Sequence, residues 1–324
     1  MVSSSPLGEN RLGPDVCAPL ALNRINLTFL THVAGDRVAL CTAAEAGEAA
    51  LAQVKSHLTP GAAVHLQPGT AILSIYPHDK RPEIIGTFIR SLARARLVLH
   101  GLASSPAAVS AVVSSRRKKG AVQELFRHFY FSGFKTPQEF FAAQPPPEEY
   151  LQKVVATYQE KVIKVYWIVP QADLDLWGMV VPTADVLEGF ANALLELADL
   201  GLAIPFLVAI PGLEGKEFLL SFSTSGSQPG PEPGSGVRRL LKRHLPDINP
   251  MRLVPVAGIF LHGPHFGDRY GIVSAMLRPL EAAGVSLLAL SCTISSISLI
   301  IRQQQLPPAL LVLRDVFEAP VEAH

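Results

Sequence analysis

The sequence repeats itself, and the repeat limits the folds that this chain can adopt. Residues 101–129 pair without a gap with residues 289–317, at a constant offset of 188 residues. Ala121 and Ala309, for example, hold equivalent positions. The length of 324 residues corresponds to about two domains. The repeat therefore predicts two similar halves, each built from the same order of helices and strands.

Within the second half, the apolar pattern predicts a strand, a polar loop, a helix, two strands and a second helix. Apolar residues at helical spacing mark the helices, and short β-rich segments mark the strands. Gly284 follows the first helix as a C-cap, and Pro279 lies inside that helix. The predicted bounds are 254–261 (strand), 262–270 (loop), 272–283 (helix), 285–291 and 295–301 (strands) and 307–317 (helix).

The same order recurs three more times, so the chain divides into four βαββα units. The first unit is incomplete, because its leading strand can only be the short segment 2–5. In the third unit, 170–182 is expected to be a long loop and 183–200 a helix. The expected boundaries are 1–60 (unit 1), 61–131 (unit 2), 132–160 (a helical linker), 161–250 (unit 3) and 251–320 (unit 4).

Composition narrows the possible functions. Hydrophobic residues make up 48% and charged residues 17%, which indicates a folded chain with a large core. The net charge of +1 gives no global field for nucleic acid or anionic membrane, and we expect neither as a partner. The basic segments 116–119 and 238–243 are interpreted as solvated helix faces. The uncharged segment 284–301 is rich in serine, which favours two strands over a membrane helix.

No motif for catalysis, cofactor binding or metal binding stands out. The segment 212–216 has the wrong spacing for a phosphate-binding loop, and no nucleophile–base pair is present. His262 and His265 lack a third metal ligand. Three separate cysteines and no signal peptide favour the cytoplasm. The sequence therefore predicts that the chain is not an enzyme and holds neither a cofactor nor a metal.

The polar loop of the last unit is the richest candidate binding site. Asp268 can pair with an amine, Arg269 with an anion, and the N–H groups of Gly271 and Ile272 with a carboxylate. The alternative is a solvated turn. The corresponding loop of unit 2 carries similar chemistry, and Asp173 follows the first strand of unit 3. The candidate ligand-binding residues are His262, Gly263, His265, Asp268, Arg269, Tyr270, Gly271, Ile272, His78, Asp79, Lys80 and Asp173.

These residues carry a resemblance to a known family. The segments 284–301 and 309–317 resemble the last ACT domain of aspartokinases, and 158–168 resembles the start of the ACT domain before it. The chain thus resembles the tandem ACT regulatory region of aspartokinases, duplicated and without the kinase domain. It departs from the family at Cys292-Thr293-Ile294, where the family has Thr-Ser-Glu.

The resemblance implies an α+β fold of four ferredoxin-like βαββαβ (ACT-type) units in two tandem pairs, with antiparallel sheets and helices on one face. It also implies a non-catalytic, regulatory, amino-acid-sensing protein that binds a small zwitterion where ACT units pair. The loops 76–83, 171–183 and 262–272 are expected to form such sites. The alternative function is a protein-interaction module of the same fold, without a small-molecule ligand, that modulates a partner enzyme. Partner binding or self-association would then use the sheet edges.

Overall fold

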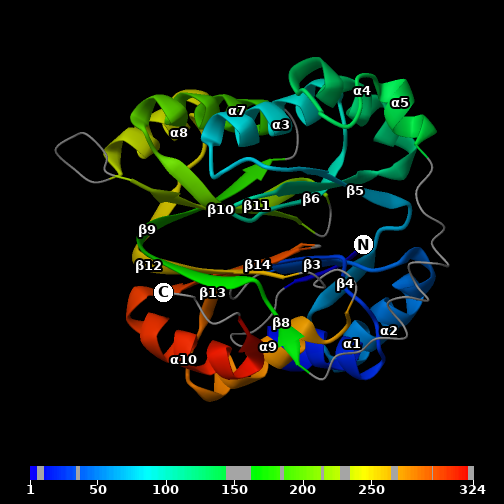
Figure 1. Ribbon diagram of the computed structural model, residues 1–324, viewed down its shortest axis with the longest axis vertical. Helices are drawn as coiled ribbons and strands as arrows, with labels where there is room; N and C mark the ends of the chain where they lie inside the picture. Colours follow the sequence, from blue (N-terminus) through cyan, green and yellow to red (C-terminus); the bar gives the residue numbers. More distant parts are fainter. Residues whose placement is uncertain are drawn as a thin grey trace.

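The computed structural model shows two β-sheets packed face to face, with helices covering the two outer faces (Figure 1). All strands of these sheets pair antiparallel. The molecule is therefore a mixed α/β fold with a large antiparallel sheet. The structure describes residues 1–5, 11–33, 37–143, 162–182, 186–212, 215–226, 234–263, 269–293 and 295–319.

The lower sheet in Figure 1 combines strands from both ends of the chain. Its order is β4-β1-β3-β2-β13-β14, followed by parts of β12 and β9. The strands are β1 (Val2–Ser5), β2 (Phe29–Val33), β3 (Arg37–Cys41), β4 (Ala63–Leu66), β13 (Leu287–Cys292) and β14 (Ser296–Arg302). The covering helices are η1 (Leu12–Cys17), α1 (Ala18–Leu22), α2 (Gly47–His57), α9 (Ile272–Ala282) and α10 (Leu306–Val316), with the short turns η2 (Ala44–Ala46) and η5 (Gln303–Gln305).

The upper sheet has the order β9-β11-β10-β6-β7-β5. Its strands are β5 (Thr70–Ile75), β6 (Leu99–Ser104), β7 (Val109–Ser114), β10 (Ala203–Pro211) and β11 (Glu217–Ser225). Its helices are α3 (Pro82–Arg94), α4 (Lys118–His128), α5 (Pro137–Ala142), α7 (Val186–Leu197) and α8 (Ser235–His244), with η3 (Ser115–Arg117) and η4 (Ala198–Leu200). A separate two-stranded sheet joins β8 (Ile163–Lys164) to β15 (Phe317–Glu318).

Two long strands belong to both sheets. Trp167 to Gln171 of β9 (Trp167–Pro182) pair with the end of β12 (Met251–His262) in the lower sheet. The rest of β9 pairs with β11 in the upper sheet. The register slips between Leu253 and Gly258, where the strands pass from one sheet to the other. This shared pair fixes the two sheets relative to each other.

Three apolar layers hold the molecule together. One core lies between the upper sheet and its helices, and a second lies between the lower sheet and its helices. A thinner layer between the sheets contains Phe206, Val208, Phe260 and Ile300. In this layer the hydroxyl of Ser291 donates to the backbone oxygen of Ser104 over 2.9 Å, which satisfies one buried polar pair.

The sequence prediction was wrong for the segment 170–182, and it underestimated the predicted strand at 2–5. The expected loop 170–182 is part of strand β9, because Leu174 and Leu176 alternate with Asp173 and Asp175 and are buried. The segment 2–5 forms a complete strand, β1, which pairs with β3 on one side and β4 on the other. Thr183, the predicted N-cap of the following helix, lies outside the described residues.

Helices α3 and α7 pack in direct contact above the upper sheet. They lie over the point where β6 pairs antiparallel with β10. Gly86 makes this close approach possible, since a Cβ atom at that position would lie 2.9 Å from the backbone oxygen of Ala191. The bulk of one methyl group therefore cannot be accommodated unless the two helices separate.

We predict that Gly86→Ala lowers the free energy of unfolding by about 1–3 kcal/mol, the usual cost of overpacking. Urea unfolding followed by circular dichroism measures this loss. Gly120→Ala on α4 is the control, because a Cβ there meets nothing within 4 Å. Equal stability of the Gly86 variant and the native protein would show that α3 and α7 pack less tightly than the structure indicates.

Candidate functional site

The candidate site lies above the pairing of β2 with β13. These strands pair antiparallel, with Leu30 opposite Cys292 and Val33 opposite Ala289. The pairing joins the first half of the chain to the second. The two helices above it run in opposite directions: the start of α9 lies beside α1, and its end lies beside η1.

A pocket opens between α1 and the start of α9. It is a shallow, solvent-open hollow whose enclosed part is about 10 Å³, room for roughly one water molecule. Apolar side chains from α1 form one wall, and backbone and side chains of α9 form the other. The lining residues are Cys17, Leu20, Ala21, Ile25, Leu27, Arg269, Gly271, Ile272, Val273, Ser274 and Cys292.

The start of α9 gives the pocket its polar groups. Gly271 precedes the helix with a φ of 81°, a left-handed conformation that glycine adopts without strain, and it has no side chain to cap the helix. The first N–H groups of a helix have no intrahelical partner and carry partial positive charge. Arg269 adds a full positive charge, and its guanidinium donates to the backbone oxygen of Val162 over 3.1 Å. This wall suits a carboxylate.

Two neutral thiols contribute to the pocket. Burial raises the pKa of Cys292 to about 12. Burial also raises the pKa of Cys17, with a smaller contribution from Cys292. Neither thiol therefore adds the negative charge that would oppose an anion in the pocket.

Among the residues singled out in the sequence, Arg269, Gly271 and Ile272 line this pocket, and Tyr270 lies between them in the chain. His265 and Asp268 lie outside the described residues. His262 stacks on Trp167 with ring centroids 5.1 Å apart, and its Nδ1 lies 3.1 Å from the hydroxyl of Ser296. Burial lowers the pKa of His262.

The residues after β5 lie at a different place in the fold. His78 is fully buried, and its Nδ1 accepts the N–H of Lys80 over 3.0 Å. Burial lowers the pKa of His78, so a neutral ring is favoured. Asp79 and Lys80 have positive φ values of 50° and 61°, and the ammonium of Lys80 donates to Gln171 over 3.1 Å. This turn therefore connects α3 to strand β9.

Asp173 and Gly263 are engaged elsewhere. Asp173 has a φ of 56° in β9, accepts a hydrogen bond from Gln303 over 2.9 Å, and donates its N–H to the same side chain. Gly263 follows β12, and its N–H donates to the backbone oxygen of Ser295. The described candidate residues thus lie in four places: the α1–α9 pocket, the end of β12 at His262 and Gly263, the Lys80–Gln171 contact and the Asp173–Gln303 contact.

Sequence reasoning missed the wall formed by Cys17, Leu20, Ala21 and Ile25. The pairing of equivalent strands would have revealed this wall. Helices α1 and α9 each follow the first strand of their segment, so pairing the segments places these helices side by side. The pairing partner of β13 could not be chosen from a single sequence.

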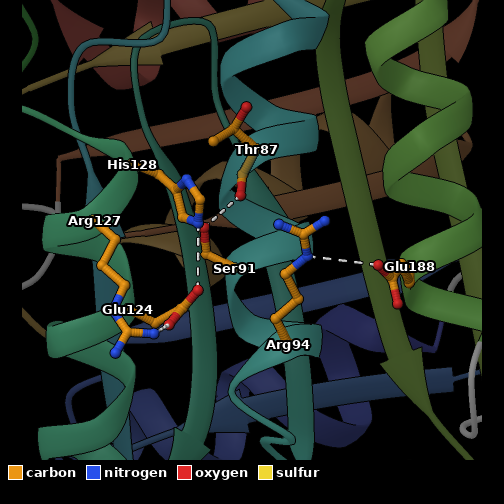
Figure 2. Close-up of polar contacts among 7 residues, drawn as sticks. All are labelled: Thr87, Ser91, Arg94, Glu124, Arg127, His128 and Glu188. Carbon is orange, nitrogen blue, oxygen red and sulfur yellow. Dashed lines mark hydrogen bonds and ion pairs between the residues drawn. The ribbon is translucent and has the colours of Figure 1, made fainter.

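At the matching interface of the upper sheet, the two helices are in close contact. There, β6 pairs with β10, and α3 and α7 touch at Gly86. Arg94 at the end of α3 faces Glu188 in the first turn of α7, with 3.6 Å between the charged groups (Figure 2). Figure 2 also shows Ser91 bonded to the backbone oxygen of Thr87.

Comparison with known proteins supports the family resemblance for part of the chain. Residues 256–315, which include α9, β13, β14 and most of α10, match the ACT domain family. No curated protein matches the chain in sequence.

Solved structures show where the same fold occurs. The structure of aspartate kinase from Synechocystis is similar over 100% of this chain, with a TM-score of 0.75 and 15% sequence identity. This chain spans 56% of that protein. The regulatory subunits of aspartate kinase from Thermus flavus and Thermus thermophilus are similar over 47% and 48% of this chain and 98% and 99% of theirs. Their TM-scores are 0.38 and 0.40, at 16% and 17% identity.

One prediction is corrected by these comparisons. The sequence analysis predicts that the chain is not an enzyme, but the whole chain is similar to a structure of aspartate kinase, which is an enzyme. The exclusion of enzymatic activity is therefore withdrawn. At 15% identity, the similarity itself shows the fold alone. Within the described residues, no helix is long and apolar enough to cross a membrane.

Strand β2 carries a buried histidine, His32. Burial lowers the pKa of His32 from 6.5 to about 4. Its Nδ1 lies 3.2 Å from the backbone oxygen of Arg37. Since an oxygen of this kind only accepts, Nδ1 carries the proton and the neutral ring is the native form. Unfolding exposes the ring and restores its ordinary pKa.

We predict that the free energy of unfolding falls by about 3 kcal/mol as the pH drops from about 6.5 to about 4. In this range the His32 ring becomes protonated in the unfolded chain but stays neutral in the native protein. His32→Asn keeps a donor for Arg37 and does not titrate, so its stability should depend less on pH in this range. Urea midpoints measured at several pH values test this. Identical pH profiles for the variant and the native protein would contradict the assignment.

Proposed function

We propose that this protein is a regulatory amino-acid-binding protein, built from four ferredoxin-like ACT-type units, and that it binds its ligand in the α1–α9 pocket. The supporting observation is the uncapped start of α9 beside Arg269, facing an apolar wall from the other half of the chain. The proposed units are 1–60, 61–131, 161–250 and 251–320, with 132–160 as a linker.

The ligand class follows from the walls of the pocket. The N–H groups of Val273 and Ser274 receive the carboxylate, and Arg269 adds to its binding. Asp268, proposed from the sequence, receives the ammonium group. Leu20, Ala21 and Ile25 contact the side chain of the ligand, which favours an amino acid with an aliphatic stem.

Regulation follows from the position of the pocket. Its walls come from helices on opposite halves of the chain, so a ligand bridges α1 and α9. Binding stabilises the conformation in which β2 and β13 are paired, and a protein partner that contacts both halves would respond to that change. His78, Asp79 and Lys80 belong to a second proposed site around Lys80 and Gln171, and Asp173 belongs to a third beside Gln303.

We predict that at least one proteinogenic amino acid raises the melting temperature of the native protein in a thermal-shift screen, because a ligand that binds only the folded state adds stability by mass action. Ala21→Leu fills the pocket and should remove this response. Ala52→Leu on α2 is the matched control, since it adds the same group to an exposed helix position.

The outcome separates this proposal from an interaction module without a small-molecule ligand. Loss of the response in Ala21→Leu, with retention in Ala52→Leu, supports the α1–α9 pocket. A response that survives Ala21→Leu places the ligand elsewhere. A screen in which no amino acid raises the melting temperature would overturn the proposed function.

A further inference from the structure

The interface between α9 and the η1–α1 helix is not symmetric. Strands β2 and β13 pair antiparallel, and the helices above them run antiparallel, so the interface has two equivalent ends. At one end, the start of α9 lies beside the end of α1 and forms the pocket. At the other end, the start of η1 lies beside the end of α9. The second end contains a carboxylate from the protein itself.

That carboxylate belongs to Glu281. Its oxygens lie against the backbone of Gly13, and the N–H of Gly13 favours the charged form of the carboxylate. A Cβ atom on Gly13 would lie 3.1 Å from the carboxyl carbon of Glu281 and 3.2 Å from its Oε2, and it would meet Oε1 closer still. Only the hydrogen of a glycine therefore leaves room for this group. Burial raises the pKa of Glu281, and the Gly13 hydrogen bond opposes that rise.

Gly13 and Val273 hold the same position in the two helices. Each is the second residue, since η1 begins at Leu12 and α9 begins at Ile272. η1 continues without a break into α1, so the helical segment covers residues 12–22. Neither helix start has a side-chain cap from its own flanking residue. The N–H group of Gly13 is thus the counterpart of the N–H group of Val273 in the pocket wall.

We propose that Glu281 is a built-in carboxylate ligand, which fills at Gly13 the position that corresponds to the pocket at Val273. The paired segments therefore offer one position to an external carboxylate instead of two. The protein binds a single ligand at this interface, and α9 contributes to both ends: its start receives the ligand, and its end supplies the internal carboxylate.

The upper interface shows that the fold does not require a carboxylate from the facing helix at this position. There, the first turn of α7 contains its own carboxylate, Glu188, which pairs with Arg94 from the facing helix. In the lower interface the carboxylate comes from the facing helix and contacts backbone. The first turn of η1 has its own acid, Asp15, but Arg11 holds both of its oxygens. Glu281 is thus positioned to bind the N–H of Gly13.

The contact between Glu281 and Gly13 does not depend on the proposed function, whereas its equivalence to a ligand position does. The test therefore uses formate, a small carboxylate, and does not need the natural ligand. Glu281→Ala removes the internal carboxylate and leaves space at Gly13. We expect the variant to melt at a lower temperature than the native protein, and added formate to restore part of the loss.

The expected recovery is about 1–2 °C in sodium formate relative to sodium chloride at equal ionic strength, growing with the logarithm of formate concentration. Glu188→Ala is the matched control, because it removes a carboxylate at the other helix interface without exposing a glycine. Its melting temperature should respond to formate no more than that of the native protein.

Two further variants keep the test decisive. Gly13→Ala combined with Glu281→Ala closes the space, so formate should lose its effect. Glu281→Gln keeps an oxygen acceptor of the same size and should fall between the native protein and Glu281→Ala in stability. An equal formate response in Glu281→Ala and Glu188→Ala, or a response that survives Gly13→Ala, would overturn the proposal. A negative formate result combined with a positive amino-acid screen would reject only the internal ligand.

Discussion

The antiparallel pairing of equivalent strands from the two halves of the chain determines the rest of the structure. Hydrogen bonds between β2 and β13 and between β6 and β10 join the halves within each sheet. The pairing also sets the helices above the strands side by side and antiparallel. Strands β9 and β12 then hold the two sheets face to face. The site is therefore a consequence of how the halves pair and not of one loop.

The two interfaces differ through a few residues. At α3 and α7, Gly86 brings a helix against the backbone of its neighbour and closes the space between them. At α1 and α9, the helices leave a pocket whose walls are an uncapped helix start and apolar side chains. Glycine thus has opposite effects in the two places: Gly86 lets two helices meet, whereas Gly13 admits the carboxylate of Glu281. Small differences in side-chain volume thus distinguish the two interfaces.

Local chemistry made much of the fold predictable from sequence. Thr136 begins α5 with the sequence pattern of a capping box, and its hydroxyl accepts the N–H of Glu139. Gly201 ends its helix with a φ of 67°, as expected for a C-cap. Long-range pairing was not predictable. The polar loop before α9 was identified from its residues. The opposite wall of the pocket depends on which strand pairs with β13, which the sequence does not show. Predicting β9 correctly required knowing that one strand can belong to two sheets.

A crystal structure of the protein with the amino acid that most raises its melting temperature tests the central claim most directly. The account predicts electron density for the ligand between α1 and α9, with its carboxylate within hydrogen-bonding distance of the N–H groups of Val273 and Ser274. Clear density for the ligand only at another place, such as between α3 and α7 or beside Lys80, would contradict the account.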